Sequence, residues 1–285
     1  MTAWSQHSDI NSFLKPSDTL NISRRNTVLI TEASLATLTL VGLNQLWYAD
    51  YPKSKFHTLN DNEEWLQMDK LGHVFSSYQL GRVGADVLNW SGVSKKNQLI
   101  YGATLGFGFL TVVEVFDGFS QEWGFSWGDM AANAAGTGLY VGQELLWKEQ
   151  RIVLKYSFHR TQYAAQRPDK LGSGLTEEFL KDYNGQTYWL SFNMSSFFKD
   201  SKIPKWLNIA LGYGADGMLT GTNTHLSNYD RGRQYYLSLD VDLTRIKTNS
   251  HVLKTLFSVF NTIKIPFPAL EINEKNGVKL HAVYF

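Results

Sequence analysis

The 285-residue sequence contains no cysteine. This absence excludes disulfide bonds, thiolate zinc sites, thiol nucleophiles and, within these residues, the acylated cysteine of a lipoprotein. The sequence also lacks the two-histidine spacing of a zinc helix, so we predict no metal site and no cofactor. A cysteine-free chain is compatible with export to a Gram-negative envelope.

Charged residues are also scarce, because they make up 19% of the chain and the net charge is only +1. A nearly neutral chain gives no electrostatic argument for a nucleic-acid partner. Aromatic residues are abundant instead, with nine Trp, fourteen Tyr and seventeen Phe. Aromatic side chains with a polar tip suit the boundary between water and lipid, which favours a membrane protein. The alternative is a large soluble core filled by aromatic rings.

A complete signal peptide is missing, since neither a basic n-region nor an apolar h-region is present. Residues 1–6 resemble the last part of such a signal, and residues 7–9 resemble a polar mature start. We therefore expect residues 1–26 to comprise a signal remnant and a polar N-terminal strap. The alternative is a cytoplasmic protein with an ordinary N-terminus.

The hydrophobic pattern changes near residue 150. Before that point, apolar residues form long blocks with Gly and Ala, which predict helices over residues 27–44, 69–89, 99–113 and 127–147. None of these blocks is a strong membrane span, because each is short or is interrupted by Glu32, Glu114 or Asn133. Residues 27–150 are therefore predicted to form a helical region.

After residue 150, apolar and polar residues alternate, as in Tyr235, Leu237 and Leu239. This period of two predicts strands over residues 151–160, 187–197, 206–214, 233–244, 262–272 and 278–285. The predicted fold class is α+β, with about four N-terminal helices packed with a C-terminal antiparallel sheet or a partial or complete outer-membrane β-barrel over residues 151–285. Six strands are too few for a closed membrane barrel, which needs at least about eight. The terminal Phe285 also resembles the end of an outer-membrane β-protein.

Polar side chains with functional potential interrupt the apolar helical blocks. Asp69 and His73 are four residues apart, so they lie on one face of a helix. A buried carboxylate needs a partner, which predicts that the polar groups of different helices gather in one cluster. The predicted cluster comprises Asp69, His73, Glu114, Asp117, Asp129 and Asn133.

Three interpretations of this cluster remain open. It can be a structural hydrogen-bond network that fixes the register of the helices, or a site that binds a lipid head group or a sugar. It can also be catalytic, with His73 as general base and Asp69 or Glu114 as its partner, or it can be a metal site formed by a histidine and carboxylates. In the binding interpretation, the contacts come from Asp117, Ser126, Asp129 and Asn133. Ser126 is in addition a predicted helix N-cap, with Asp129 three residues later.

Three motifs occur in order within residues 65–147. They are Asp69-Lys70-x-x-His73-x-x-Ser76, then Glu114-x-x-Asp117, then Phe125-Ser126-x-x-Asp129-Met130-x-x-Asn133-x-x-Gly136. This region resembles the YfiM-like family of uncharacterised envelope proteins and, more distantly, the VanZ-like helical membrane family. The resemblance implies an envelope location and a helical core, but no established reaction. The strand-rich second half looks like that of outer-membrane versions of the YfiM-like family.

These observations together predict an outer-membrane protein that is a non-catalytic accessory or binding subunit of an envelope assembly. The expected partners are the lipid bilayer of the outer membrane and other outer-membrane proteins. The alternative is an envelope hydrolase or transferase that acts on a lipid or glycan through His73. The prediction depends on one inference, namely that one face of the C-terminal sheet meets lipid.

Overall fold

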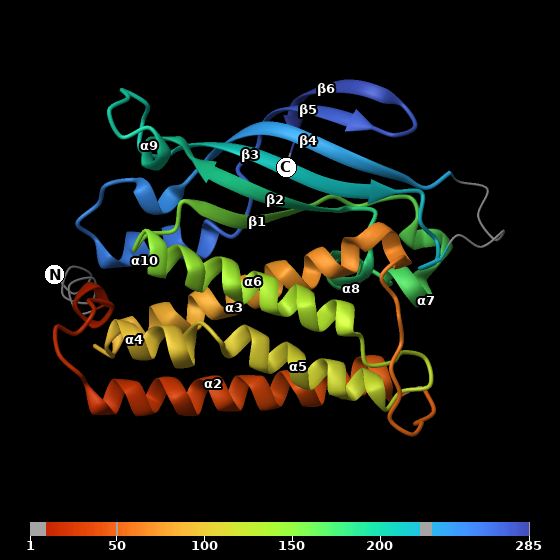
Figure 1. The fold of residues 1–285 in the computed structure, drawn as a ribbon, viewed down its shortest axis with the longest axis horizontal. Helices are drawn as coiled ribbons and strands as arrows, with labels where there is room; N and C mark the ends of the chain where they lie inside the picture. The colour runs from red at the N-terminus through yellow and green to blue at the C-terminus, as the bar shows by residue number, and fades with distance from the viewer. Residues whose placement is uncertain (1–9, 50, 223–229, 285) are drawn as a thin grey trace, which may run out of the picture. The chain divides into compact units, whose positions relative to one another are not determined.

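The structure is a computed structural model that describes residues 10–49, 51–222 and 230–284 (Figure 1). The chain divides into two compact units, which we call the helical unit (Met1–Asn62 and Ser76–Lys148) and the sheet unit (Glu63–Phe75 and Glu149–Phe285). The predicted signal remnant over residues 1–6, the predicted mature start over residues 7–9 and Phe285 lie outside the described residues.

The predicted α+β class is confirmed, since helices accompany a six-stranded antiparallel sheet. Its strands are β1 (Ile152–Phe158), β2 (Gln186–Asn193), β3 (Leu207–Asp216), β4 (Gly232–Val241), β5 (Phe267–Asn273) and β6 (Gly277–Tyr284). Neighbours in sequence are neighbours in the sheet, and among the described residues β1 and β6 are not paired with each other. The alternative of a complete barrel is therefore wrong for this sheet, as six strands are too few to close one.

The helical unit follows the predicted helical blocks with shifted boundaries, and the block over residues 99–113 is divided between a π-helix and an α-helix. It contains α2 (Ile22–Leu43), the π-helix η1 (Asn44–Tyr48), α3 (Met68–Trp90) from Ser76 onward, α4 (Lys95–Asn97), the π-helix η3 (Gln98–Gly102), α5 (Leu105–Gly118) and α6 (Trp127–Leu146). Helix α2 begins five residues before its predicted start at residue 27, because Asn21 caps it by accepting a hydrogen bond from the Arg24 N–H.

Two helical stretches are long and apolar enough to cross a membrane, by length and composition alone. They are Ile22–Leu43, which is α2, and Lys95–Gly118, which joins α4, η3 and α5. Both stretches continue beyond the apolar runs of the sequence. Core helices and signal sequences have the same length and composition, so the expectation that none of the blocks is a strong membrane span is not contradicted.

Glycines bring two segments of the helical unit into backbone contact. A Cβ added at Gly81 would lie 2.3 Å from the Ala103 carbonyl oxygen, and one at Gly106 would lie 2.3 Å from that of Ser77. No side chain fits at these distances, so α3 and the start of α5 touch through their backbones. Such close approach is the packing that small residues allow between helices in membranes.

The sheet unit adds short helices before its first strand and in the connections between its strands. They are the 3-10 helices η2 (Glu64–Gln67), η4 (Ala164–Gln166) and η5 (Leu243–Arg245), and the helices α7 (Pro168–Leu171), α8 (Leu175–Lys181), α9 (Met194–Phe197) and α10 (His251–Phe260). The predicted strand over residues 187–197 ends at Asn193, because its side chain accepts a hydrogen bond from the Ser196 N–H and so caps α9.

The last two strands form a hairpin. Asn273 pairs with Gly277, so the loop between β5 and β6 has three residues, 274–276. Gly277 has a φ of 71°, the left-handed conformation that closes such three-residue loops. A register irregularity lies between Phe267 and Ala269, where Pro268 cannot donate a ladder hydrogen bond.

One face of the sheet is apolar. Strand pairing places six leucines in one row across all six strands, namely Leu154, Leu190, Leu211, Leu237, Leu270 and Leu280. The neighbouring row consists of Tyr156, Tyr188, Tyr213, Tyr235, Ile272 and Val278. The side chains of this apolar face are more exposed on the later strands. Leu237 on β4 is 48% exposed, and Leu280 on β6 is 74% exposed.

The opposite face of the sheet is mostly buried and combines polar side chains with a hydrophobic cluster of Trp189, Ala210 and Tyr236. Lys155 and Asp240 are both fully buried there, and their Nζ and Oδ2 atoms lie 2.8 Å apart. Asp240 also accepts hydrogen bonds from the Ser191 Oγ at 2.6 Å and from the Ile265 N–H at 3.0 Å. Lys155 donates a further bond to the Val241 carbonyl oxygen. The buried charges are therefore paired and hydrogen-bonded, as burial of charge requires.

Candidate functional site

The predicted polar residues fall into two groups, one in each compact unit. Asp69 and His73 belong to the sheet unit, whereas Glu114, Asp117, Ser126, Asp129 and Asn133 belong to the helical unit. The single cluster of Asp69, His73, Glu114, Asp117, Asp129 and Asn133 remains a prediction.

Asp69 and His73 lie one turn apart on the first part of α3. The Asp69 Oδ1 is 3.9 Å from the His73 Nε2, which is too long for a hydrogen bond. The Tyr183 hydroxyl donates to the same oxygen at 2.8 Å, and the Lys70 Nζ donates to the Oδ2 at 3.2 Å. Desolvation alone would raise the pKa of Asp69, but His73, Lys70 and Tyr183 together lower this pKa below its usual value. Asp69 is therefore an anion at neutral pH.

A strained turn introduces this group. Trp65, Leu66 and Gln67 have φ values of 47°, 50° and 64°, so three consecutive non-glycine residues are left-handed. The Trp65 N–H donates to the Gly221 carbonyl, and the Tyr213 hydroxyl donates to the Leu66 carbonyl at 2.6 Å. Left-handed conformations cost roughly 1–2 kcal/mol per residue and persist only where surrounding contacts hold them. The contacts with the sheet thus fix where α3 begins.

The first part of α3 packs on the tyrosine row of the sheet. The Phe75 ring lies 5.6 Å from the Tyr156 ring and 5.7 Å from the Tyr188 ring, measured between centroids. Met68 is fully buried in a cluster with Ala215 and Met218. These contacts hold Asp69 and His73 above β1, β2 and the end of β3.

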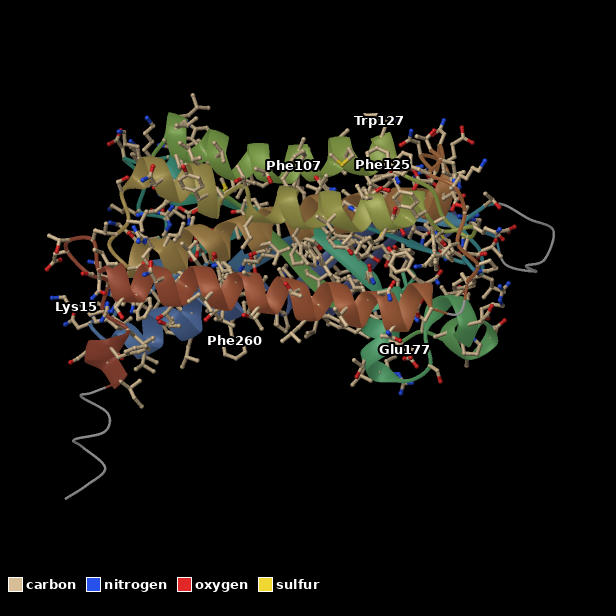
Figure 2. All side chains as sticks on the ribbon, turned by 90° about the horizontal axis from the view of Figure 1, so that it is seen from below. Lys15, Phe107, Phe125, Trp127, Glu177 and Phe260 are labelled. Atoms are coloured by element: carbon tan, nitrogen blue, oxygen red, sulfur yellow. The ribbon has the colours of Figure 1, made fainter. Side chains whose placement is uncertain are left out.

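In the helical unit, the polar group gathers around the start of α6. The Ser126 Oγ accepts from the Asp129 N–H at 3.1 Å, which confirms the predicted N-cap. The same Oγ donates to the Asp61 Oδ1 at 2.6 Å. The Ser126 N–H donates to the Glu114 Oε2 at 3.0 Å, so Glu114 accepts the bond that the third helix residue accepts in a capping box. Phe125 and Trp127, labelled in Figure 2, flank this cap.

Two further contacts involve predicted site residues of the helical unit. The Tyr48 hydroxyl donates to the Asp117 Oδ1 at 2.7 Å. Burial raises the pKa of Tyr48, and the charges of Asp117 and Glu114 raise it further, so Tyr48 stays a neutral donor. The Asn133 carbonyl oxygen accepts from the Ser77 Oγ at 2.7 Å, which ties α6 to α3.

Sequence reasoning missed three residues that complete these groups, namely Tyr48, Asp61 and Tyr183. Asp61 lies in a loop rich in Asp and Asn, and Tyr183 lies in a stretch dense in polar and aromatic residues, so both had a local signal. Neither signal names its partner, since 114 positions separate Tyr183 from Asp69. Tyr48 lies at the end of a helix and has no distinguishing signal.

The chemistry available differs between the two groups. Glu114, Ser126, Asp129 and Asn133 are all at least 97% buried, and the bonds described for them cap a helix or join helices. Asp69 and His73 are partly exposed, with 25% and 15% of their side chains accessible. At 3.9 Å the ionised Asp69 carboxylate acts on the His73 imidazole through its charge and not through a hydrogen bond. Of the predicted catalytic residues, only Asp69 and His73 thus form a pair that reaches solvent.

Residues 59–143 match the family described as Predicted periplasmic lipoprotein (DUF2279). The matched stretch contains all seven predicted site residues and covers less than a third of the chain. No curated protein and no solved structure matches the chain. The YfiM-like and VanZ-like resemblances therefore stay predictions. Through this stretch, the chain is similar to an uncharacterised family of bacterial envelope proteins.

Proposed function

We propose that this protein resides in the outer membrane as a non-catalytic accessory or binding subunit of an envelope assembly. The family match supports the envelope. The outer membrane and the role as a subunit are proposed here from the distribution of polar and apolar side chains. None of the 285 residues is a cysteine, so membrane contacts of this part of the chain must come from side chains.

The observation that carries the proposal is the inverted character of the sheet. The face with Lys155 and Asp240 is buried, whereas the opposite face is exposed at Leu211, Leu237 and Leu280, outside the part that α3 covers at Tyr156 and Tyr188. Exposed apolar area costs about 25 cal/mol per Å² in water. A continuous exposed apolar surface of this kind is typical of an interaction site. In hydrocarbon that cost disappears, and a polar inner face with an apolar outer face is the rule for transmembrane β-structure.

Helix α2 supports the same environment. Its 22 residues extend about 33 Å, close to the roughly 30 Å of a bilayer core. Apolar side chains are exposed along its length, namely Leu29, Ile30, Leu35, Leu38 and Val41. At its N-terminal end, the Arg24 guanidinium lies 4.4 Å from the Trp90 ring and donates to the Lys15 carbonyl oxygen. Arginine and tryptophan are typical of the membrane interface.

The open edge of the sheet supports a role as a subunit. The outer edge of β1 is partly covered by the segment before β5. The Tyr156 N–H donates to the Thr262 carbonyl oxygen, and the Lys264 N–H donates to the Tyr156 carbonyl oxygen. Among the described strands, β6 pairs with β5 alone. Unpaired backbone groups cost several kcal/mol each in hydrocarbon. A partner protein that pairs with β6 would remove this cost.

A non-catalytic role is favoured by the burial of most of the candidate residues. Glu114, Ser126 and Asp129 take part in helix capping, and their burial gives a substrate no access. The alternative, an envelope hydrolase or transferase with His73 as general base, rests on the Asp69–His73 pair. His73→Gln separates the two. It should leave envelope integrity unchanged in the non-catalytic role and abolish turnover in the enzyme.

The proposal is tested by separating the membranes of cells that produce the full chain on a sucrose density gradient. We expect the protein in the outer-membrane fraction, resistant to sodium carbonate, and accompanied by other proteins after extraction in mild detergent. Recovery as a lone monomer in the soluble fraction would contradict both parts of the proposal. Recovery in the outer membrane without any accompanying protein would contradict only the role as a subunit.

A further inference from the structure

Two long connections of the sheet lie at the same end. In an antiparallel sheet, the connection from β2 to β3 (residues 194–206) and the connection from β4 to β5 (residues 242–266) leave from one end. Figure 1 shows α9 and α10 at this end, and α7 and α8 at the other. We call residues 194–206 and 242–266 the basic end of the sheet.

Charge is distributed unequally between the two ends. The basic end has seven cationic residues (Lys199, Lys202, Lys205, Arg245, Lys247, Lys254 and Lys264) and two acidic ones (Asp200 and Asp242). The connections at the other end, residues 159–185, 217–231 and 274–276, have six of each. Their cations are Arg160, Arg167, Lys170, Lys181, Arg231 and Lys275, and their acids are Asp169, Glu177, Glu178, Asp182, Asp230 and Glu274.

Most of the cations at the basic end are available to a partner. Its lysines are exposed except for Lys264, which is fully buried. Arg245 forms ion pairs with Glu149 and with Asp242, which is itself buried. Asp200 is therefore the one exposed acid among these residues. The surface consequently favours an anionic partner.

Apolar side chains accompany the lysines. Helix α10 is amphipathic, and its apolar face points outward through Leu253, Leu256, Val259 and Phe260, of which Leu256 is 44% exposed. Phe260 is labelled in Figure 2. In a water-soluble protein this face would be turned toward the core. The β2–β3 connection adds three exposed aromatic side chains, those of Phe197, Phe198 and Trp206.

We propose that the basic end lies in the head-group layer of a phospholipid leaflet that contains anionic lipid, with α10 in the plane of the leaflet. A basic helix of this kind buries its apolar face about 5–10 Å into the boundary between head groups and acyl chains. The lysines then contact lipid phosphates, and Trp206 lies at the interface, where tryptophan is enriched. The inference rests on the proposed membrane location and adds an orientation for the sheet.

The test uses the absence of cysteine, because a single introduced cysteine can be labelled selectively. The full chain with Leu256→Cys, carrying an environment-sensitive NBD label, is reconstituted into vesicles of phosphatidylcholine alone, with phosphatidylglycerol, or with lipid A. We expect a blue-shifted label, quenched by brominated acyl chains, in the phosphatidylglycerol vesicles. The matched control is Lys254→Cys, about 200° around the helix from Leu256, whose label should stay accessible to aqueous iodide.

Charge variants test the source of the attraction. Lys247→Gln in the Leu256→Cys background should lower the ratio of inserted to aqueous label about fivefold in phosphatidylglycerol vesicles. Equal insertion in all three vesicle types would overturn the role of anionic lipid, and insertion only with lipid A would overturn the phospholipid leaflet. A label that stays aqueous at position 256 overturns the inference. If a Leu237→Cys label is nevertheless in the acyl region, the proposed membrane location survives; if both are aqueous, it fails too.

Discussion

Asp240→Asn is expected to destabilise the protein by about 3–5 kcal/mol, the usual cost of breaking a buried ion pair. Asp240 holds the buried Lys155 Nζ at 2.8 Å and accepts two further hydrogen bonds, from Ser191 and Ile265. Asparagine has nearly the same volume, so the substitution leaves the packing intact. It leaves the Lys155 charge without a counterion and turns an amide donor toward neighbouring donors. The free energy of unfolding of a typical domain is about 5–15 kcal/mol, so the loss is a large fraction of the stability.

The matched control is Asp216→Asn in the same sheet. Asp216 and Lys275 form an ion pair of similar length, 2.7 Å, but both side chains are partly exposed. Such pairs contribute about 0–1 kcal/mol. Both variants are measured by urea unfolding in detergent micelles, followed by far-ultraviolet circular dichroism. Equal losses in the two variants would refute the reasoning that the inner face of the sheet depends on buried charge pairing.

Three further substitutions test other parts of the structure. Burial lowers the pKa of Lys264 to about 8 from 10.5, so the unfolded chain binds more protons between these values and stability should rise from about pH 8 to pH 10.5. Lys264→Met should remove that rise in pH-dependent urea titrations. Ser126→Ala should cost about 1–2 kcal/mol in unfolding free energy, because the cap and the bond to Asp61 are both lost. Gly212→Ala should lower the midpoint of thermal unfolding and cost about 1–3 kcal/mol, since its Cβ would lie 2.7 Å from the Trp189 ring. A pH-dependent rise that persists in Lys264→Met would contradict the first prediction. An unchanged unfolding free energy in Ser126→Ala or an unchanged midpoint in Gly212→Ala would contradict the second or the third.

The regular elements of the fold could be predicted from the sequence because their signals are local. The alternation through Tyr235, Leu237 and Leu239 predicts β4 and indicates that all three side chains share one face. Ser126 predicts a helix start because a cap needs only residues three positions apart. The start of α2 was missed because residues 22–26 are mostly polar, and a polar segment is also typical of a strap.

The candidate site could be predicted only as a set of residue types. The pair Asp69 and His73 follows from helical spacing, and the structure places the two side chains 3.9 Å apart between Oδ1 and Nε2. The contacts of Asp69 with Tyr183 and of Ser126 with Asp61 depend on how distant segments pack, and no periodicity records this. That Glu114, and not Asp129, accepts the hydrogen bond from the Ser126 N–H also depends on how distant segments pack.

The central claim, that the leucine face of the sheet meets lipid, is tested most directly at Leu237. A Leu237→Cys variant carrying an NBD label is reconstituted into vesicles and exposed to brominated phospholipids or to aqueous iodide. Lys279→Cys, on an exposed position of the opposite face of the sheet, is the control. The account predicts quenching of the Leu237 label by brominated acyl chains and not by iodide, and the reverse for Lys279. Quenching of the Leu237 label by iodide alone would contradict it.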